Sequence, residues 1–181
     1  NTTGNTNTAV GRNSLGANTT AANNVAVGSD ALKLNTTGAN NTAVGATSLD
    51  ANTTGVYNTA VGRSVLGSNI TGGYNTALGV NALAANTTAD NNIAVGYLAL
   101  GANTTGHSNV AVGYEALSTN IDGDGLVAVG YQALKAFEPS DGLRYTIGIG
   151  YQAGLVCTAG GDNVFIGGLS GKAVTDGNNN V

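Results

Sequence analysis

The chain has 181 residues and a net charge of −4, with 5% aromatic and 9% charged residues, whereas about a quarter of the residues in soluble domains are charged. This composition excludes a thick core of large side chains. The 41% of apolar residues and the low net charge argue against disorder. The six basic residues are scattered along the chain, so we expect no nucleic-acid partner.

The chain lacks the usual membrane and export signals. No run of 18 apolar residues occurs, and no charged stretch followed by an apolar one opens the sequence. We therefore expect neither a membrane span nor a signal peptide in this segment. The single cysteine, Cys157, cannot form an internal disulfide, so it does not indicate a redox compartment.

A 17-residue repeat runs through most of the chain. The tripeptide Ala-Val-Gly, or Ala-Leu-Gly once, ends in glycines spaced 17 residues apart from Gly11 to Gly130. Gly150 follows after 20 residues, and Gly167 after another 17. A leucine follows each of the first eight glycines by four positions, and a turn of the Asn-Thr-Thr type starts three positions later in most copies. Three anchors in one register identify a structural unit that is repeated about ten times.

The residues before each glycine predict a short strand. A Val, Leu or Ile directly before the glycine and a Thr, Val or Ile two positions earlier flank a small residue, and this alternation fits a strand. The Ala-Leu pair after the glycine is compatible with a second short strand, and Asn-Thr-Thr-Gly is typical of a turn. Helical repeats need units of about 33 to 47 residues. We therefore predict an all-β fold, a parallel β-solenoid whose turns stack about 4.8 Å apart.

Stacked turns would place identical side chains above one another. We predict an interior made of the Val or Leu column before the glycine and the Leu column after it. The predicted core residues are Val10, Val27, Val44, Val61, Leu78, Val95, Val112, Val129, Leu15, Leu32, Leu49, Leu66, Leu83, Leu100, Leu117 and Leu134. The alanine column lies on the opposite strand face. Because a strand that is apolar on both faces is normally covered on both, we expect a neighbouring chain on one of them; the residues alone leave open on which.

Four tyrosines follow the glycines of successive repeats, and we expect them to stack as a ladder on a surface or at an interface. They are Tyr97, Tyr114, Tyr131 and Tyr151. Two interpretations stay open, structural packing and an aromatic platform for a sugar or a partner. Tyr57 and Tyr74 form a smaller pair elsewhere on the repeat.

The repeat becomes irregular after Gly130. Residues 135–146 insert three residues and break the polar turn, which predicts a loop bulging from the solenoid or an adjustment toward a cap, with a ligand-binding loop as the alternative. We place the repeat array at residues 1–171 and expect residues 172–181 to leave it as a polar tail or linker. Neither end resembles a cap, which suggests flanking domains or end-to-end assembly.

The sequence holds no recognisable catalytic pattern. Residues 148–153 match a dinucleotide fingerprint, but no helix pattern follows them. Asp122 and Asp124 lie in a polar turn without the closing glutamate of a calcium loop, and His107 is the only histidine. We expect a protein that is not an enzyme, with no catalytic, metal-binding or cofactor-binding residues and no cofactor.

The pattern Asn-Thr-Ala-Val-Gly-Tyr-x-Ala-Leu followed by Asn-Thr-Thr-Gly, over residues 5 to about 171, resembles the head repeats of YadA-type trimeric autotransporter adhesins. It is also similar to the 17-residue version found in phage and bacterial tail-fibre-like proteins. The resemblance implies a left-handed parallel β-roll, three chains in one trimer, and a place on a cell or virion surface. We therefore expect an extracellular structural and adhesive fibre segment that associates with itself, with a cell-surface glycan or receptor as a further partner.

Two other functions stay open. One is a self-polymerising extracellular filament or matrix subunit. The other is an ice-binding solenoid that presents a regular threonine column, namely Thr20, Thr37, Thr54, Thr88 and Thr105. A flat hydroxyl array needs threonines two apart on one strand face, and the Thr-Thr turns do not provide this. Several turns also match the Asn-x-Thr glycosylation pattern, among them those starting at Asn18 and Asn35, as a by-product of the turn consensus.

Overall fold

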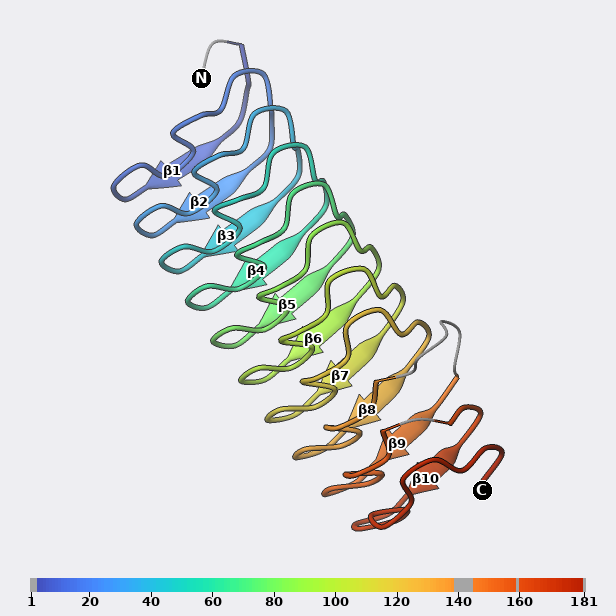
Figure 1. Ribbon diagram of the computed structural model, residues 1–181. Helices are drawn as coiled ribbons and strands as arrows, with labels where there is room; N and C mark the ends of the chain where they lie inside the picture. Colours follow the sequence, from blue (N-terminus) through green and yellow to red (C-terminus); the bar gives the residue numbers. More distant parts are fainter. Residues whose placement is uncertain (1–2, 139–144, 159, 181) are drawn as a thin grey trace.

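The computed structural model describes residues 3–138, 145–158 and 160–180, and within these ranges it contains ten strands and no helix. The strands are β1 (Thr8–Val10), β2 (Val25–Val27), β3 (Thr42–Val44), β4 (Thr59–Val61), β5 (Thr76–Leu78), β6 (Ile93–Val95), β7 (Val110–Val112), β8 (Val127–Val129), β9 (Ile147–Ile149) and β10 (Val164–Ile166). They form one parallel sheet in sequence order, and the two ends of the chain lie at opposite ends of the rod (Figure 1). The predicted β-solenoid is confirmed.

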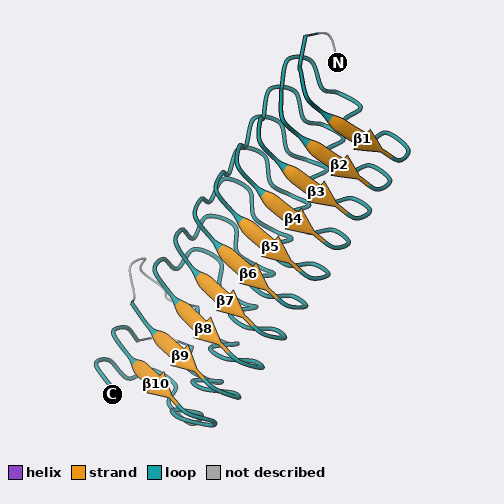
Figure 2. Ribbon diagram, turned by 180° about the vertical axis from the view of Figure 1, so that it is seen from behind, coloured by secondary structure: helices purple, strands orange, loops and turns teal. Residues whose placement is uncertain are grey.

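Each strand pairs in register with the strand one turn later. In β2 and β3, for example, Val25 lies opposite Thr42 and Ala26 opposite Ala43. Seen from behind, the strands occupy one side of the coil and irregular segments complete each turn (Figure 2). The predicted second strand after the glycine is absent from the described residues, because that segment bends repeatedly instead of extending.

The glycine that follows each strand is required for two reasons, its backbone conformation and the space around it. Its φ lies between 118° and 140° in the ten copies, a region that is accessible essentially to glycine alone. The backbone of the next turn also passes where a side chain would begin. A Cβ added to Gly28 would lie 2.5 Å from the carbonyl oxygen of Gly45. Tight stacking therefore explains why the sequence returns to glycine at this position.

The interior beneath the sheet is filled by alanine and leucine. Ala26 and its equivalents are fully buried from β2 to β8, and the leucine column is buried from Leu15 onward. The predicted leucine core is thus confirmed. The predicted valine core is wrong for the single chain, because valine points to the other side of the sheet; Val10 is 58% exposed and Val27 half-buried. The leucines leave room only for a small residue, since a Cβ added to Gly148 would lie 2.6 Å from Cγ of Leu134.

Two columns of buried asparagine also line the interior. The turn-side Asn ladder consists of Asn18, Asn35, Asn52, Asn69, Asn86, Asn103 and Asn120. The strand-side Asn ladder consists of Asn24, Asn41, Asn58, Asn75, Asn92 and Asn109. Every buried side-chain nitrogen and oxygen of the described residues has a hydrogen-bond partner, as burial of polar groups requires.

The two ladders meet at one carbonyl in each turn. Nδ2 of Asn69 donates to Oδ1 of Asn52 at 2.8 Å and to the carbonyl oxygen of Gly72 at 2.9 Å. Nδ2 of Asn58 donates to the same Gly72 oxygen at 2.8 Å, and Oδ1 of Asn58 accepts the backbone N–H of Asn75 at 3.0 Å. The ladders therefore supply the bonds that a 17-residue coil with only three strand residues cannot make within its sheet.

The turn-side ladder ends at Asn120 without an orphaned group. Phe137 takes the next place in the column and is fully buried, as is Cys157 after it. Oδ1 of Asn120 instead accepts the backbone N–H of Gly123 at 3.2 Å. The change from amide to apolar filling near the C-terminal end thus leaves the last amide satisfied.

Residues 172–180 continue the coil, so the prediction that this segment leaves the solenoid is wrong. Thr158 donates its backbone N–H to the carbonyl oxygen of Thr175 at 2.9 Å, and Val164 donates to Asn180 at 2.7 Å. Nδ2 of Asn163 donates to the Gly177 oxygen at 2.7 Å. Backbone bonds between turns hold this segment although the Ala-Val-Gly consensus has ended. Most of the predicted loop at 135–146 falls on residues 139–144, which lie outside the described residues.

Candidate interaction surfaces

The outward strand face is a regular and largely apolar surface that runs along the rod. We define it as the first and third residues of β1 to β10, which all point away from the alanine-lined interior. It consists of β-branched residues and leucine, and none of its positions is charged. Its side chains are half-buried or exposed; Leu78 is 48% and Ile93 42% exposed. Parallel sheets are rarely left open on one face, so this face is a candidate interaction surface.

The ion pairs lie away from this face. Arg12 reaches Asp30 at 2.9 Å on the segment after β1 and β2, and Lys135 reaches Glu115 at 2.7 Å on the segment after β7 and β8. The hydrogen bond from Lys135 lowers the pKa of Glu115 below its usual value, with a second contribution from Gln132. These ion pairs therefore lie on segments that follow the strands, and the outward strand face itself carries no charged residue.

The predicted tyrosine ladder is confirmed. The ring centroids of Tyr97 and Tyr114 are 5.1 Å apart, those of Tyr114 and Tyr131 5.2 Å, and those of Tyr131 and Tyr151 5.3 Å. Neighbouring rings deviate from parallel by 9° to 19°. All four side chains are exposed. Tyr57 and Tyr74 form a second stack with centroids 5.0 Å apart.

Stacking determines which parts of the tyrosine rings a ligand can contact. Both ring faces of Tyr114 and Tyr131 are covered by neighbouring rings, so the solvent meets ring edges and hydroxyls. A sugar that packs its C–H groups on an aromatic face finds an uncovered face only at the two ends of the stack. The interpretation of the ladder as an extended sugar platform therefore loses its main physical support.

A row of polar side chains runs beside the tyrosine ladder. Gln152 donates Nε2 to Oε1 of Gln132 at 2.9 Å, and Gln132 donates Nε2 to Oε2 of Glu115 at 2.9 Å. The nearby carboxylate of Glu115 is the main cause of the raised pKa of Tyr114. The phenol of Tyr114 therefore stays protonated at neutral pH, and the polar row fixes the register of the turns that carry the rings.

His107, Asp90 and Asp124 accept hydrogen bonds from backbone N–H groups of neighbouring turns. Nδ1 of His107 accepts the backbone N–H of Asp90 at 2.9 Å, and Oδ1 of Asp124 accepts the backbone N–H of His107. Asp90 in turn accepts the N–H of Gly73 at 2.6 Å. Sequence reasoning did not connect these residues, although their spacing of 17 was the available signal. No group of three potential metal ligands occurs in the part of the chain that the structure describes.

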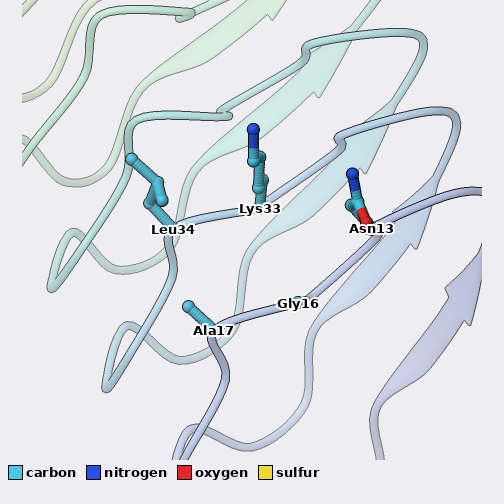
Figure 3. Close-up of a pocket in the computed structure, with 5 residues that line it drawn as sticks. All are labelled: Asn13, Gly16, Ala17, Lys33 and Leu34. Carbon is cyan, nitrogen blue, oxygen red and sulfur yellow. The ribbon is translucent and has the colours of Figure 1, made fainter.

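A surface hollow of about 300 Å³ lies near the N-terminal end, lined by Asn13, Gly16, Ala17, Lys33 and Leu34 from two successive turns (Figure 3). Lys33 is its one charged residue, and its Nζ lies 3.7 Å from Oδ1 of Asp30. The other four lining residues carry no titratable side chain.

The threonine and asparagine turns are less available than their sequence suggests. Thr20 and Thr37 belong to an exposed column, but the adjoining threonines use their hydroxyls internally; Oγ1 of Thr36 donates to the carbonyl oxygen of Thr53 at 3.0 Å. The asparagines of the glycosylation pattern are buried in the turn-side ladder, where the Nδ2 of Asn35 donates to the Gly38 oxygen. Folding therefore encloses the amide nitrogen that glycosylation would modify.

Comparison with protein-family models, with curated proteins and with solved structures finds no match for this chain. Among the residues that the structure describes, no helix is long and apolar enough to cross a bilayer. Two features of the molecule itself are the candidates for interaction, namely the outward strand face and the tyrosine ladder.

Proposed function

We propose that this chain is a rod segment of an extracellular surface fibre, in which copies of the chain associate through their outward strand faces. The observation that carries the proposal is that face: ten strands wide, uncharged, and still exposed after the chain has filled its own interior with alanine and leucine. The resemblance of the repeats to the heads of trimeric adhesins and to tail-fibre-like proteins favours three chains and a place on a cell or virion surface.

A second copy of the chain is the occupant whose spacing fits the face. Every turn of this chain repeats the same two outward columns at the strand spacing of a parallel sheet, about 4.8 Å. Another copy has the same spacing, so apolar side chains can interdigitate along the whole rod without loss of register. Closed rotational symmetry, as in a homotrimer, would cover the face in every copy.

The solenoid has the mechanical properties that a fibre needs. Ten turns at the usual strand spacing give a rod on the order of 48 Å long, and hydrogen bonds join consecutive turns on every side of the coil. The turns display the same polar groups many times over. Attachment to a glycan or receptor would then come from many weak contacts acting together, which raises the effective affinity without a deep binding pocket.

Two matched leucines allow a direct test. Leu78 lies on the outward strand face and Leu34 on the segment after β2, and both side chains are 48% exposed in the single chain. We expect Leu78→Glu to weaken self-association strongly, because a carboxylate would be buried against apolar side chains. Leu34→Glu places the same charge on an equally exposed leucine elsewhere and should leave self-association unchanged. Sedimentation velocity over a range of concentrations measures both.

Two results would contradict the proposal. One is equal self-association of the two variants, which would place the contact elsewhere on the rod. The other is a large, heterogeneous mass that persists in Leu78→Glu, which would assign the contact to the open sheet edges at β1 and β10 and make the chain an end-to-end filament subunit. Circular dichroism of each variant distinguishes lost association from lost folding.

A further inference from the structure

We propose that the tyrosine ladder is a site of oxidative cross-linking, at which consecutive turns become joined by carbon–carbon bonds between neighbouring phenols. The reaction needs a one-electron oxidant, such as a haem peroxidase supplied with hydrogen peroxide. The site goes beyond the fibre function proposed above and does not depend on it, because all four rings belong to one chain.

The geometry provides what radical coupling requires. Coupling needs two exposed phenols that stay close long enough for both to be oxidised. The rings of Tyr97, Tyr114, Tyr131 and Tyr151 are exposed and lie 5.1 to 5.3 Å from centroid to centroid. Backbone hydrogen bonds between turns hold the chain beneath the rings. The backbone N–H of Gln132, for example, donates to the carbonyl oxygen of Tyr114 at 2.8 Å. The fold therefore performs the pairing that unordered tyrosines achieve only by collision.

The chemistry balances with peroxide as the final oxidant. Each phenol loses one electron to the peroxidase and one proton from Oη to the solvent, which leaves a phenoxyl radical. Two radicals on neighbouring rings combine through the ring carbons next to the hydroxyls, and each ring regains its aromaticity as the hydrogen on that carbon moves to the oxygen. In sum, two tyrosines and one hydrogen peroxide give one dityrosine and two water molecules.

The rest of the chain supplies internal comparisons. Tyr57 and Tyr74 are stacked with centroids 5.0 Å apart and should couple as well. Tyr145 occupies the same column of the repeat and is 58% exposed, but it lies beside Gly125 and no ring contact is found for it among the described residues. Proximity of rings predicts coupling between Tyr57 and Tyr74 and none at Tyr145, whereas exposure alone predicts that Tyr145 reacts as readily as Tyr57 and Tyr74.

The test is to treat the purified protein with a haem peroxidase and hydrogen peroxide, and to map the products by mass spectrometry. Trypsin cleaves after Arg63, Lys135 and Arg144, so a bond between Tyr131 and Tyr151 joins peptides 64–135 and 145–172. A bond between Tyr57 and Tyr74 joins peptides 34–63 and 64–135. Each bond lowers the mass of the joined peptides by two hydrogen atoms and adds the blue fluorescence of a biphenol.

The variant Tyr131→Phe separates stacking from coupling, because it keeps an aromatic ring in the ladder but removes the phenol. We expect it to abolish the link between peptides 64–135 and 145–172 through Tyr151 while the link of Tyr57 to Tyr74 persists. A denaturing gel should show the linked product at the mass of one chain. The proposal fails if the links involve mainly Tyr145, if they join separate chains, or if the unmodified protein forms none while free tyrosine in the same mixture does.

Discussion

The variant Asn69→Asp tests whether the buried turn-side Asn ladder holds the coil together. The two side chains have nearly the same shape, so packing is preserved. In the native chain, Nδ2 of Asn69 donates to Oδ1 of Asn52 and to the Gly72 oxygen. An ionised aspartate has no donor, so an oxygen would face two oxygens inside a buried column.

The expected loss in the free energy of unfolding depends on which hydrogen-bonding groups keep a partner in the variant. Two buried hydrogen bonds are lost, at about 1 to 1.5 kcal/mol each. The Gly72 oxygen keeps its bond from Asn58, but Oδ1 of Asn52 loses its donor, which adds about 1 to 3 kcal/mol. We therefore expect Asn69→Asp to lower the free energy of unfolding by about 3 to 6 kcal/mol at neutral pH.

The loss should depend on pH. Burial beside two oxygens raises the pKa of the introduced carboxyl in the folded state, while the unfolded value stays near 3.9. The folded state then holds a proton that the unfolded state releases, so the variant gains stability relative to the native chain as pH falls from 7 toward about 4. A protonated carboxyl can also donate one of the two lost bonds.

Urea unfolding followed by circular dichroism, at one fixed protein concentration, measures these differences. The matched control is Asn91→Asp, because Asn91 is exposed at a φ of 62° and aspartate also tolerates that conformation. We expect the control to stay within about 0.5 kcal/mol of the native chain. The reasoning is refuted if the two variants are equally stable, or if the deficit of Asn69→Asp does not shrink in acid.

Three further predictions concern the glycine column, the leucine column and the cysteine. Gly28→Ala should destabilise the fold by at least about 2 kcal/mol, because its φ is 139° and its Cβ would meet the next turn; Gly67→Ala, whose Cβ finds ordinary contacts, should melt like the native protein. Leu83→Ala, at a fully buried site, should lower the urea-derived free energy of unfolding by about 2 to 5 kcal/mol; a loss below about 1 kcal/mol would mean that the leucine column is not the core. The thiol of Cys157 is buried, and burial raises its pKa; it should react with a disulfide reagent only on unfolding, and rapid reaction of the folded protein would contradict its placement.

The repeat register made the solenoid and its leucine column predictable from the sequence. Gly11 to Gly130 recur at one spacing, and a leucine four positions later recurs with them, so only stacked turns of equal length satisfy both. The same regularity made the tyrosine ladder predictable, because residues at one position of every turn must lie above one another.

The orientation of the strands was not predictable, because alanine and valine are both apolar and either could have faced inward. The narrow interior decides this in favour of alanine, and the interior becomes visible only once Leu134 and its equivalents are placed. The asparagine ladders were missed for a related reason. Asn35 and Asn69 are ordinary turn residues by local pattern, and they become buried and bonded only through the neighbour 17 residues away.

The C-terminal segment continues the coil although its sequence departs from the repeat consensus. Residues 172–180 lack the Ala-Val-Gly pattern, yet Asn180 donates its backbone N–H to Oδ1 of Asn163 at 2.9 Å and so restarts the strand-side ladder. The useful signal was a single asparagine at the repeat spacing. Polar residues at fixed positions of a repeat therefore deserve the same weight as apolar ones when the ends of a solenoid are predicted.

The native mass of the unmodified chain tests the central claim most directly. Light scattering on a size-exclusion column, over a wide range of loading concentrations, should give three times the chain mass of 17.7 kDa, as expected if the outward strand faces pack against one another in a homotrimer. A mass of one chain at every concentration would contradict the account, because the outward strand face would then remain exposed to water in the native protein.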